Sequence, residues 1–273
     1  MIIRASVLVV GLPAWIAIVG LAGAVGAYPG GTPYYQTDVS PYCAGCHSSI
    51  SEDALAGAGA LAERELVTNK HLAPIQKGEG PYAKLSPADR EILVQQIQTV
   101  DENSKIELAD YPPQVKAGEV FNLTVLVTGG AGPTVGVALV DRAHRWYARP
   151  FSARGWSIVG APTVIGPDGK PQSAWLERRP ERMGRGLTFV NITGVESDVV
   201  AGKYSKSKVI FRLKAPDKPG EYPVVGAYFY GTEKATPLGS DIHPLTGTEE
   251  PLGGFDGKSG RVKFSEPLVI SVK

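Results

Sequence analysis

The hydrophobic periodicity of this chain changes near residue 105, and this change constrains the fold more than any other feature. After it, apolar and β-branched residues alternate with polar ones, as in Val120–Val127, and turn-forming clusters such as 129–133 and 216–220 separate the runs. Alternating runs between turn signals predict β-strands. Further runs are Val135–Val140, Trp156–Val159, Leu187–Ile192, Lys208–Leu213, Tyr222–Tyr230 and Val262–Val272. Many short strands with regular turns predict an all-β sandwich over residues 105–273.

The residues before this change carry helical patterns. Ser86 is followed by Pro87, which is typical of a helix N-cap and first turn, and apolar residues then recur on one face up to about Val100. A weaker helical segment covers residues 50–66, where two glycines lower the helix propensity. We therefore expect a small helical domain over residues 28–104, and a multidomain α + β chain as the fold class.

Residues 43–47 read Cys-Ala-Gly-Cys-His, and the chain has no other cysteine. The C-x-x-C-H spacing is the attachment motif of c-type haem. Two cysteines one helical turn apart form thioethers to one porphyrin edge, and the next residue brings an imidazole to the iron. The alternatives are a redox C-x-x-C or a disulfide, but no βαβ pattern surrounds the motif and no second ligand pair indicates zinc. We predict one covalent haem c, held by Cys43 and Cys46, with His47 as proximal iron ligand.

The N-terminal segment, residues 1–27, has the pattern of a secretory signal peptide. Arg4 precedes an apolar stretch that ends in small residues at Ala27, and Tyr28-Pro29-Gly30 then breaks any helix. Haem is joined to such motifs on the exported side of a membrane, so a periplasmic or other extracytoplasmic location is predicted. The stretch is also long enough to span a bilayer. An uncleaved segment would therefore anchor the chain in the membrane.

The charge of the chain is nearly balanced, at a formal net value of +1. Nothing in the sequence indicates a nucleic-acid partner. Eight arginines nevertheless lie between Arg142 and Arg185, among few acidic residues. This cluster is either a docking patch for an acidic redox protein, a set of partners for haem propionates, or a solvated loop region.

The segment 38–102 resembles a small monohaem cytochrome c domain. The resemblance rests on Cys43, Cys46 and His47, and on a closing helix that begins at Leu85-Ser86-Pro87. It implies a six-coordinate iron that carries single electrons. The sequence departs from the family at the second axial ligand, which is usually a methionine.

The distal iron ligand is predicted to be His71. Apart from Met1, the only methionine is Met183, which lies far away in the β region, whereas His71 follows the haem motif within the helical segment. The alternatives are a solvent-facing His71, with Met183, His144 or His243 as the ligand. A bis-histidine iron has a lower reduction potential than a His/Met iron.

The β region resembles an immunoglobulin-like sandwich of exported bacterial proteins. The resemblance rests on the segment 116–119 leading into Val120–Val127, and on the turn 215–222 leading into Pro223–Tyr230. It implies the fold only and assigns no catalytic residue.

These features together predict an exported monohaem c-type cytochrome that carries electrons between redox protein partners, with the β-sandwich as a docking or anchoring module. We expect an electron-transfer protein more than an enzyme. One alternative is a haem enzyme or small-ligand sensor with an open sixth iron position. Another is a surface interaction or structural protein whose haem is incidental.

Overall fold

The computed structural model describes residues 66–143, 151–173, 188–253 and 259–273. The predictions for the signal peptide and for Cys43, Cys46 and His47 lie outside the described residues. Met183 and His144 also lie outside them.

The described chain begins with four short or medium helices. Ser86 starts the longest one, since its hydroxyl accepts a hydrogen bond from the Asp89 amide at 3.2 Å, as an N-cap does. The residue after α3, Gly78, has a left-handed φ of 70°, which ends that helix. In order, the helices are the π-helix η2 (Thr68–Leu72), α3 (Ala73–Lys77), the 3₁₀-helix η3 (Gly80–Lys84) and α4 (Pro87–Asn103). The helix start predicted at Ser86 is confirmed.

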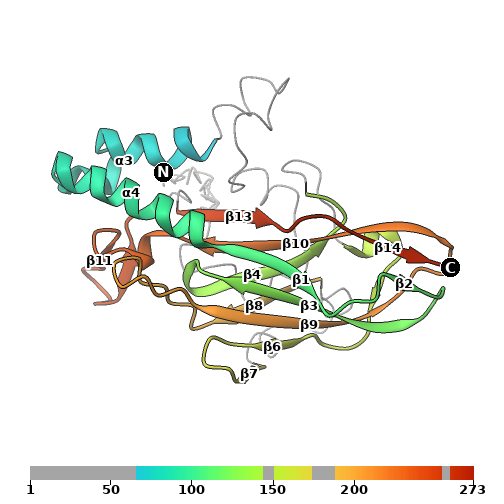
Figure 1. The fold of residues 1–273 in the computed structure, drawn as a ribbon. Helices are drawn as coiled ribbons and strands as arrows, with labels where there is room; N and C mark the ends of the chain where they lie inside the picture. Colours follow the sequence, from blue (N-terminus) through green and yellow to red (C-terminus); the bar gives the residue numbers. More distant parts are fainter. Residues whose placement is uncertain (1–65, 144–150, 174–187, 254–258) are drawn as a thin grey trace, which may run out of the picture.

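Two six-stranded sheets make up most of the rest (Figure 1). The first has the order β1-β3-β9-β6-β7, with β5 also paired to β9. Its strands are β1 (Lys105–Ala109), β3 (Val120–Thr128), β5 (Ser157–Ile158), β6 (Thr163–Ile165), β7 (Pro171–Gln172) and β9 (Lys206–Lys214).

The second sheet has the order β2-β14-β10-β4-β8, with β13 also paired to β10. Strands β13 and β14 follow one another along the same side of β10, from Gly231↔Gly260 to Gly220↔Val272. The strands are β2 (Gln114–Val115), β4 (Ala131–Val140), β8 (Phe189–Thr193), β10 (Gly220–Gly231), β13 (Gly260–Phe264) and β14 (Leu268–Val272). A small hairpin of β11 (Ser240–Ile242) and β12 (Glu249–Pro251) and the 3₁₀-helices η4 (Phe151–Arg154) and η6 (Glu233–Ala235) complete the described elements.

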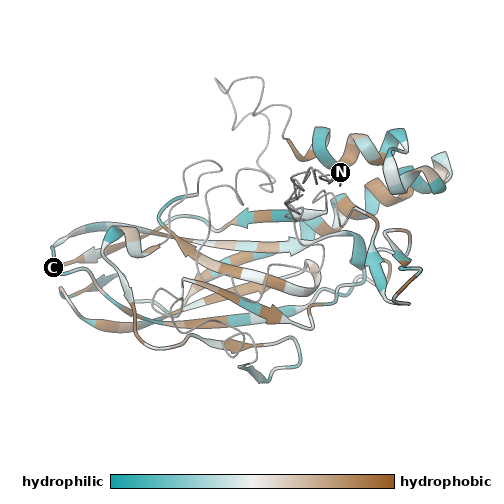
Figure 2. Ribbon diagram, turned by 180° about the vertical axis from the view of Figure 1, so that it is seen from behind, coloured by the Kyte–Doolittle hydropathy of each residue, from teal (hydrophilic) through white to brown (hydrophobic). Residues whose placement is uncertain are grey.

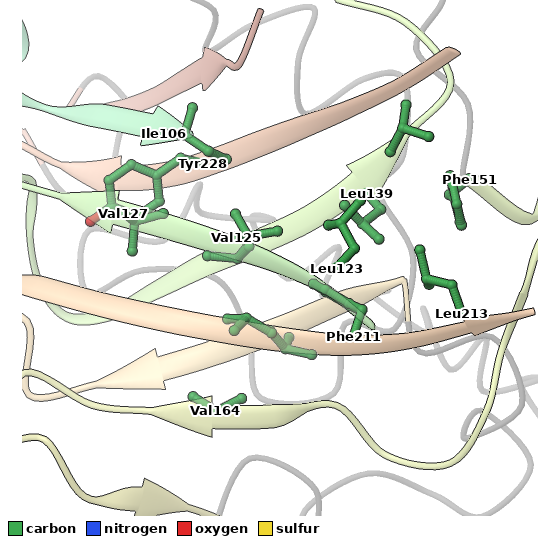
Figure 3. Close-up of a cluster of buried hydrophobic side chains, with 14 of the residues drawn as sticks. Ile106, Leu123, Val125, Val127, Leu139, Phe151, Val164, Phe211, Leu213 and Tyr228 are labelled. Carbon is green, nitrogen blue, oxygen red and sulfur yellow. The ribbon is translucent and has the colours of Figure 1, made fainter. Parts of the chain in front are cut away.

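The main hydrophobic core lies between the two sheets (Figure 3). Successive strand residues point to opposite faces, so alternate apolar residues meet in this layer. Leu123 and Val125 enter it from β3, Phe211 enters it from β9, and Val137 and Leu139 enter it from β4, all fully buried. The alternation that predicted strands therefore also identifies the inward face.

The predicted small helical cytochrome-like domain is wrong for the described chain, and with it the predicted fold class. The described residues are mostly strand, in several sheets, and contain only the two α-helices α3 and α4. These helices pack on one end of the β structure, opposite the C-terminus (Figures 1 and 2). They form one cluster with Leu252, which follows β12. The cluster comprises Leu72, Ile75, Tyr82, Leu93, Val94, Ile97 and Leu252.

The physical reason is that helical periodicity shows which face of a helix is apolar, but not which element will cover it. Here the covering element is the end of the β structure. The change from helix to strand does fall at Ser104, between α4 and β1. Whether the regions on either side of Ser104 fold independently stays a prediction.

Polar contacts also tie α4 to the second sheet. The Tyr230 hydroxyl on β10 donates a hydrogen bond to the Asp101 carboxylate near the end of α4. The Lys263 ammonium on β13 donates to the backbone oxygens of Asp101 and Ser104, the latter at 3.0 Å. In the described parts of the chain, no helix is long and apolar enough to cross a membrane.

Candidate functional site

Of the residues predicted to hold the haem (Cys43, Cys46, His47 and His71), only His71 lies in the described part of the chain, in a buried polar cluster at the helix end of the molecule. It sits in η2 and is 1% exposed. Its Nε2 atom is 2.5 Å from Oε1 of Glu233, at the start of η6. Its Nδ1 atom contacts Nη2 of Arg261 on β13. Both imidazole nitrogens therefore have protein partners.

The contacts define the protonation state of His71. A guanidinium group can only donate hydrogen bonds, so Nδ1 must accept from Arg261 with its lone pair. The proton of a neutral imidazole is then on Nε2, where it is donated to the Glu233 carboxylate. Burial lowers the pKa of His71 below its usual value, and this outweighs the opposing effect of Glu233. His71 is thus a neutral imidazole at pH 7, with its electron pair on Nδ1.

Glu233 is fully buried and accepts three side-chain hydrogen bonds. Besides His71, the hydroxyl of Tyr82 donates to Oε1 at 3.0 Å and the hydroxyl of Thr232 donates to Oε2 at 3.0 Å. Burial alone would raise the pKa of Glu233, but His71 and the charge of Arg261 outweigh it and hold that pKa below its usual value. The carboxylate is therefore ionised and balances the positive charge of Arg261.

The backbone makes room for this cluster at Gly253. A Cβ atom added there would lie 2.3 Å from the Tyr82 hydroxyl and 2.7 Å from Oε1 of Glu233. Real Cβ atoms do not approach other atoms so closely. Any larger residue at this position would therefore force Tyr82 or Glu233 to shift.

A pair of buried tyrosines continues the polar region into the sandwich. The rings of Tyr228 and Tyr230 lie 4.8 Å apart, and Tyr228 donates a hydrogen bond to the Gly129 carbonyl at 2.8 Å. Burial, and for Tyr230 also the nearby Asp101, raises both tyrosine pKa values well above the usual range. Tyr230 is also the register partner of Arg261 across β10 and β13. Both phenols therefore stay protonated at ordinary pH.

Other residues from the sequence prediction have structural roles where they are described. His243 lies in the turn of the β11–β12 hairpin, and its Nδ1 accepts hydrogen bonds from the amides of Leu245 and Thr246, each at 3.3 Å. From the arginine-rich region, Arg142 and Arg154 both contact the buried carboxylate of Asp141, at 3.3 and 3.2 Å. Among the described residues, two guanidinium groups thus lie on the Asp141 carboxylate just after β4.

Sequence reasoning missed Glu233, Arg261 and Tyr82. A weak signal was present, since Glu233 comes three residues after the long apolar run Tyr222–Tyr230, and Arg261 directly precedes the predicted strand Val262–Val272. A charged residue at the end of a buried strand indicates either an exposed strand end or a paired buried charge. Here the charges are buried and paired.

The described residues fit a haem site in one respect. A ligating histidine commonly donates its second ring N–H to a carboxylate, which orients the ring, and His71 donates Nε2–H to Glu233 in that way. Iron ligation at Nδ1 would require Arg261 to leave that atom. Within the described ranges, no group of three or more His, Cys, Asp or Glu residues could hold a metal ion.

A separate cleft of about 540 Å³ lies beside η6 and the β11–β12 hairpin. Its charged side chains are mixed in sign and include Lys203, Lys234, Asp198 and Glu249. This mixture does not favour one class of ligand.

The comparisons with known proteins do not identify a family. No protein-family model matches the chain, and no curated protein matches it. Solved structures that it resembles include the enzyme AvmM, which catalyses macrocyclization in alchivemycin A biosynthesis (11% identity, 62% of this chain and 87% of that chain, TM-score 0.27). Another is the ASH/PapD-like domain of human CEP192 (11% identity, 63% and 85%, TM-score 0.21). A third is a family 123 glycoside hydrolase from Clostridium perfringens (9% identity, 63% and 27%, TM-score 0.25). Likenesses this low carry no argument about this chain.

Proposed function

We propose that this protein is an exported monohaem c-type cytochrome that carries single electrons between redox protein partners. The observation that carries the proposal is the sequence Cys43-Ala44-Gly45-Cys46-His47, which holds the only two cysteines of the chain. When bound, the haem supplies one-electron exchange between ferrous and ferric iron. The chain supplies two thioether anchors and the proximal imidazole of His47.

His71 remains the proposed distal ligand. Its burial in η2 and its hydrogen bond to Glu233 support this role, because both would orient the ring. The lone pair on Nδ1 is the donor, so Arg261 would have to exchange its contact with that atom for another partner. Glu233 would keep the proton on Nε2 and increase the donor strength of the ring.

A haem enzyme or sensor with an open sixth iron position is the second candidate. The observation that favours it is that Glu233 and Arg261 together engage both nitrogens of His71. In that case His71 has no iron to bind, and the buried cluster is a structural link between the helices and the sheet.

One set of variants tests both candidates. In Cys43→Ser/Cys46→Ser, haem staining on a denaturing gel should disappear; haem that remains covalently bound would overturn the proposal. In His71→Ala, a low-spin absorption spectrum should become high-spin and sensitive to carbon monoxide. His243→Ala is the matched control, because His243 lies in a surface hairpin. If His71→Ala leaves a low-spin spectrum unchanged, another residue is the distal ligand; if the unaltered protein already binds carbon monoxide, the second candidate is favoured.

A further inference from the structure

The second sheet has an apolar cluster on the side away from the main core. In β10, Val224 and Tyr228 point into the main core, whereas Val225, Ala227 and Phe229 belong to a different cluster. Because successive strand residues face opposite sides, this second cluster is on the outer face of the sheet. We call it the outer-face cluster, and its members include Val140, Phe189, Val225, Ala227, Phe229 and Val262.

The outer-face cluster is buried although it faces away from the sandwich core. Val140, Val225 and Ala227 are 0% exposed, and Phe229 is 5% exposed. In the part of the chain that the structure describes, the cluster draws its members only from β4, β8, β10 and β13, all in one sheet. An apolar sheet face needs a cover from another layer.

The described chain starts beside β13, a strand that contributes Val262 to the outer-face cluster. His71 in η2 contacts Arg261 of β13, which pairs with β10 alone among the described strands. Arg261 is the register partner of Tyr230 and therefore lies on the main-core side of the sheet, whereas the next residue, Val262, lies on the outer face. The contact therefore places the start of the described chain at this strand, and not on the outer face itself. The 20 residues from Cys46 to Leu66 would span about 30 Å even as a helix, whereas four strands are only about 14 Å wide. The segment that carries the haem motif is therefore long enough to cross the four strands that hold the outer-face cluster.

Positively charged side chains at one end of the face could pair with the propionate groups of a haem. Val140 is the last residue of β4, and Asp141 follows it. The carboxylate of Asp141 contacts the guanidinium groups of Arg142 and Arg154. Among the described side chains at this place, two guanidinium groups lie against one carboxylate, which gives an excess of positive charge. Arginine forms bidentate pairs with carboxylates, which is the chemistry of a haem propionate.

We propose that the outer-face cluster receives the haem-bearing segment, residues 28–65, with the haem against the apolar strands and its propionates toward Arg142 and Arg154. The inference rests on the proposed function, because it requires haem on Cys43 and Cys46. In this arrangement, the outer face of the second sheet forms one side of the haem pocket.

The test is methyl NMR of the haem-loaded full chain in its ferric and ferrous states. Paramagnetic ferric iron shifts and broadens nearby methyl signals, so Val225 and Val140 should change strongly between the two states. Val224 and Leu139 are matched controls, because they come from the same strands and point into the main core. Their changes should be much smaller. Single Val225→Ala and Val140→Ala substitutions assign the signals.

The outcomes separate this inference from the proposed function. Haem that is covalently attached, with equal or no changes at Val225 and Val224, would overturn the inference and leave the cytochrome proposal standing. The face is then covered by another segment, such as residues 174–187, or by a second copy of the chain. Absence of attached haem, measured as a pyridine haemochrome, would overturn both.

Discussion

Glu233→Ala should destabilise the chain by about 3–5 kcal/mol, the range expected when one partner of a buried ion pair is removed. The substitution removes the acceptor that His71 and Tyr82 share in a fully buried place, whereas the Thr232 hydroxyl can still donate to the Ser259 carbonyl at 3.2 Å. It also removes a buried negative charge that interacts with the charge of Arg261. Each unsatisfied buried donor costs about 1–3 kcal/mol. These costs are not additive, since the side chains can rearrange around the deleted group.

Glu233→Gln separates the charge from the hydrogen bonds. The amide oxygen can still accept from His71 and Tyr82, and Thr232 can still donate to the Ser259 carbonyl, so mainly the charge is lost. A smaller loss is expected, about 1–3 kcal/mol. The assay is equilibrium urea unfolding followed by far-UV circular dichroism, with the free energy of unfolding extrapolated to water.

Glu91→Ala is the matched control, because Glu91 is an exposed carboxylate on α4. Surface substitutions of this kind usually change stability little. The reasoning would be refuted if Glu233→Ala and Glu91→Ala unfolded at the same urea concentration. That result would mean that the His71 cluster contributes no net stability.

Three further predictions follow from the same structure. Burial holds the pKa of His71 in the folded chain below its usual 6.5, so the unfolded chain binds more protons at pH values between the folded-state pKa and 6.5. The stability of the haem-free protein should therefore fall as the pH drops from about 7.5 to 5.5. The urea midpoints at these two pH values should differ less in His71→Gln than in the unaltered chain, and an equal pH dependence in both would contradict the assignment. Gly253→Ala should displace Tyr82 or Glu233 and lower the urea midpoint, because the added Cβ would lie 2.3 Å from the Tyr82 hydroxyl and 2.7 Å from the Glu233 carboxylate; a midpoint equal to that of the unaltered chain would argue against the close approach. Phe211→Ala should cost about 3–5 kcal/mol in calorimetry or urea unfolding, as for other buried aromatic side chains; a loss under 1 kcal/mol would show that the core collapses around the cavity.

The sequence by itself determined the local structure well. The helix start at Ser86, the change from helix to strand near residue 105 and the long strands such as Val120–Thr128 were predicted correctly. The run Val262–Val272 was predicted as one strand but forms two, β13 and β14, and the short strands β2, β6, β7, β11 and β12 were not predicted. The physical reason is that capping, helix periodicity and strand alternation depend on residues a few positions apart. The C-x-x-C-H motif is local in the same sense, and it remains the basis for predicting covalent haem.

Only the tertiary structure decided what the helices and His71 contact. The helices were expected to form a separate domain, but they share a hydrophobic cluster with the end of the β structure. The partners of His71 are Glu233 and Arg261, which are 162 and 190 residues away in sequence. Their positions follow from the pairing of β10 with β13 and from the packing of η2 on that pair. Such contacts depend on how distant elements pack, which no local pattern around His71 encodes.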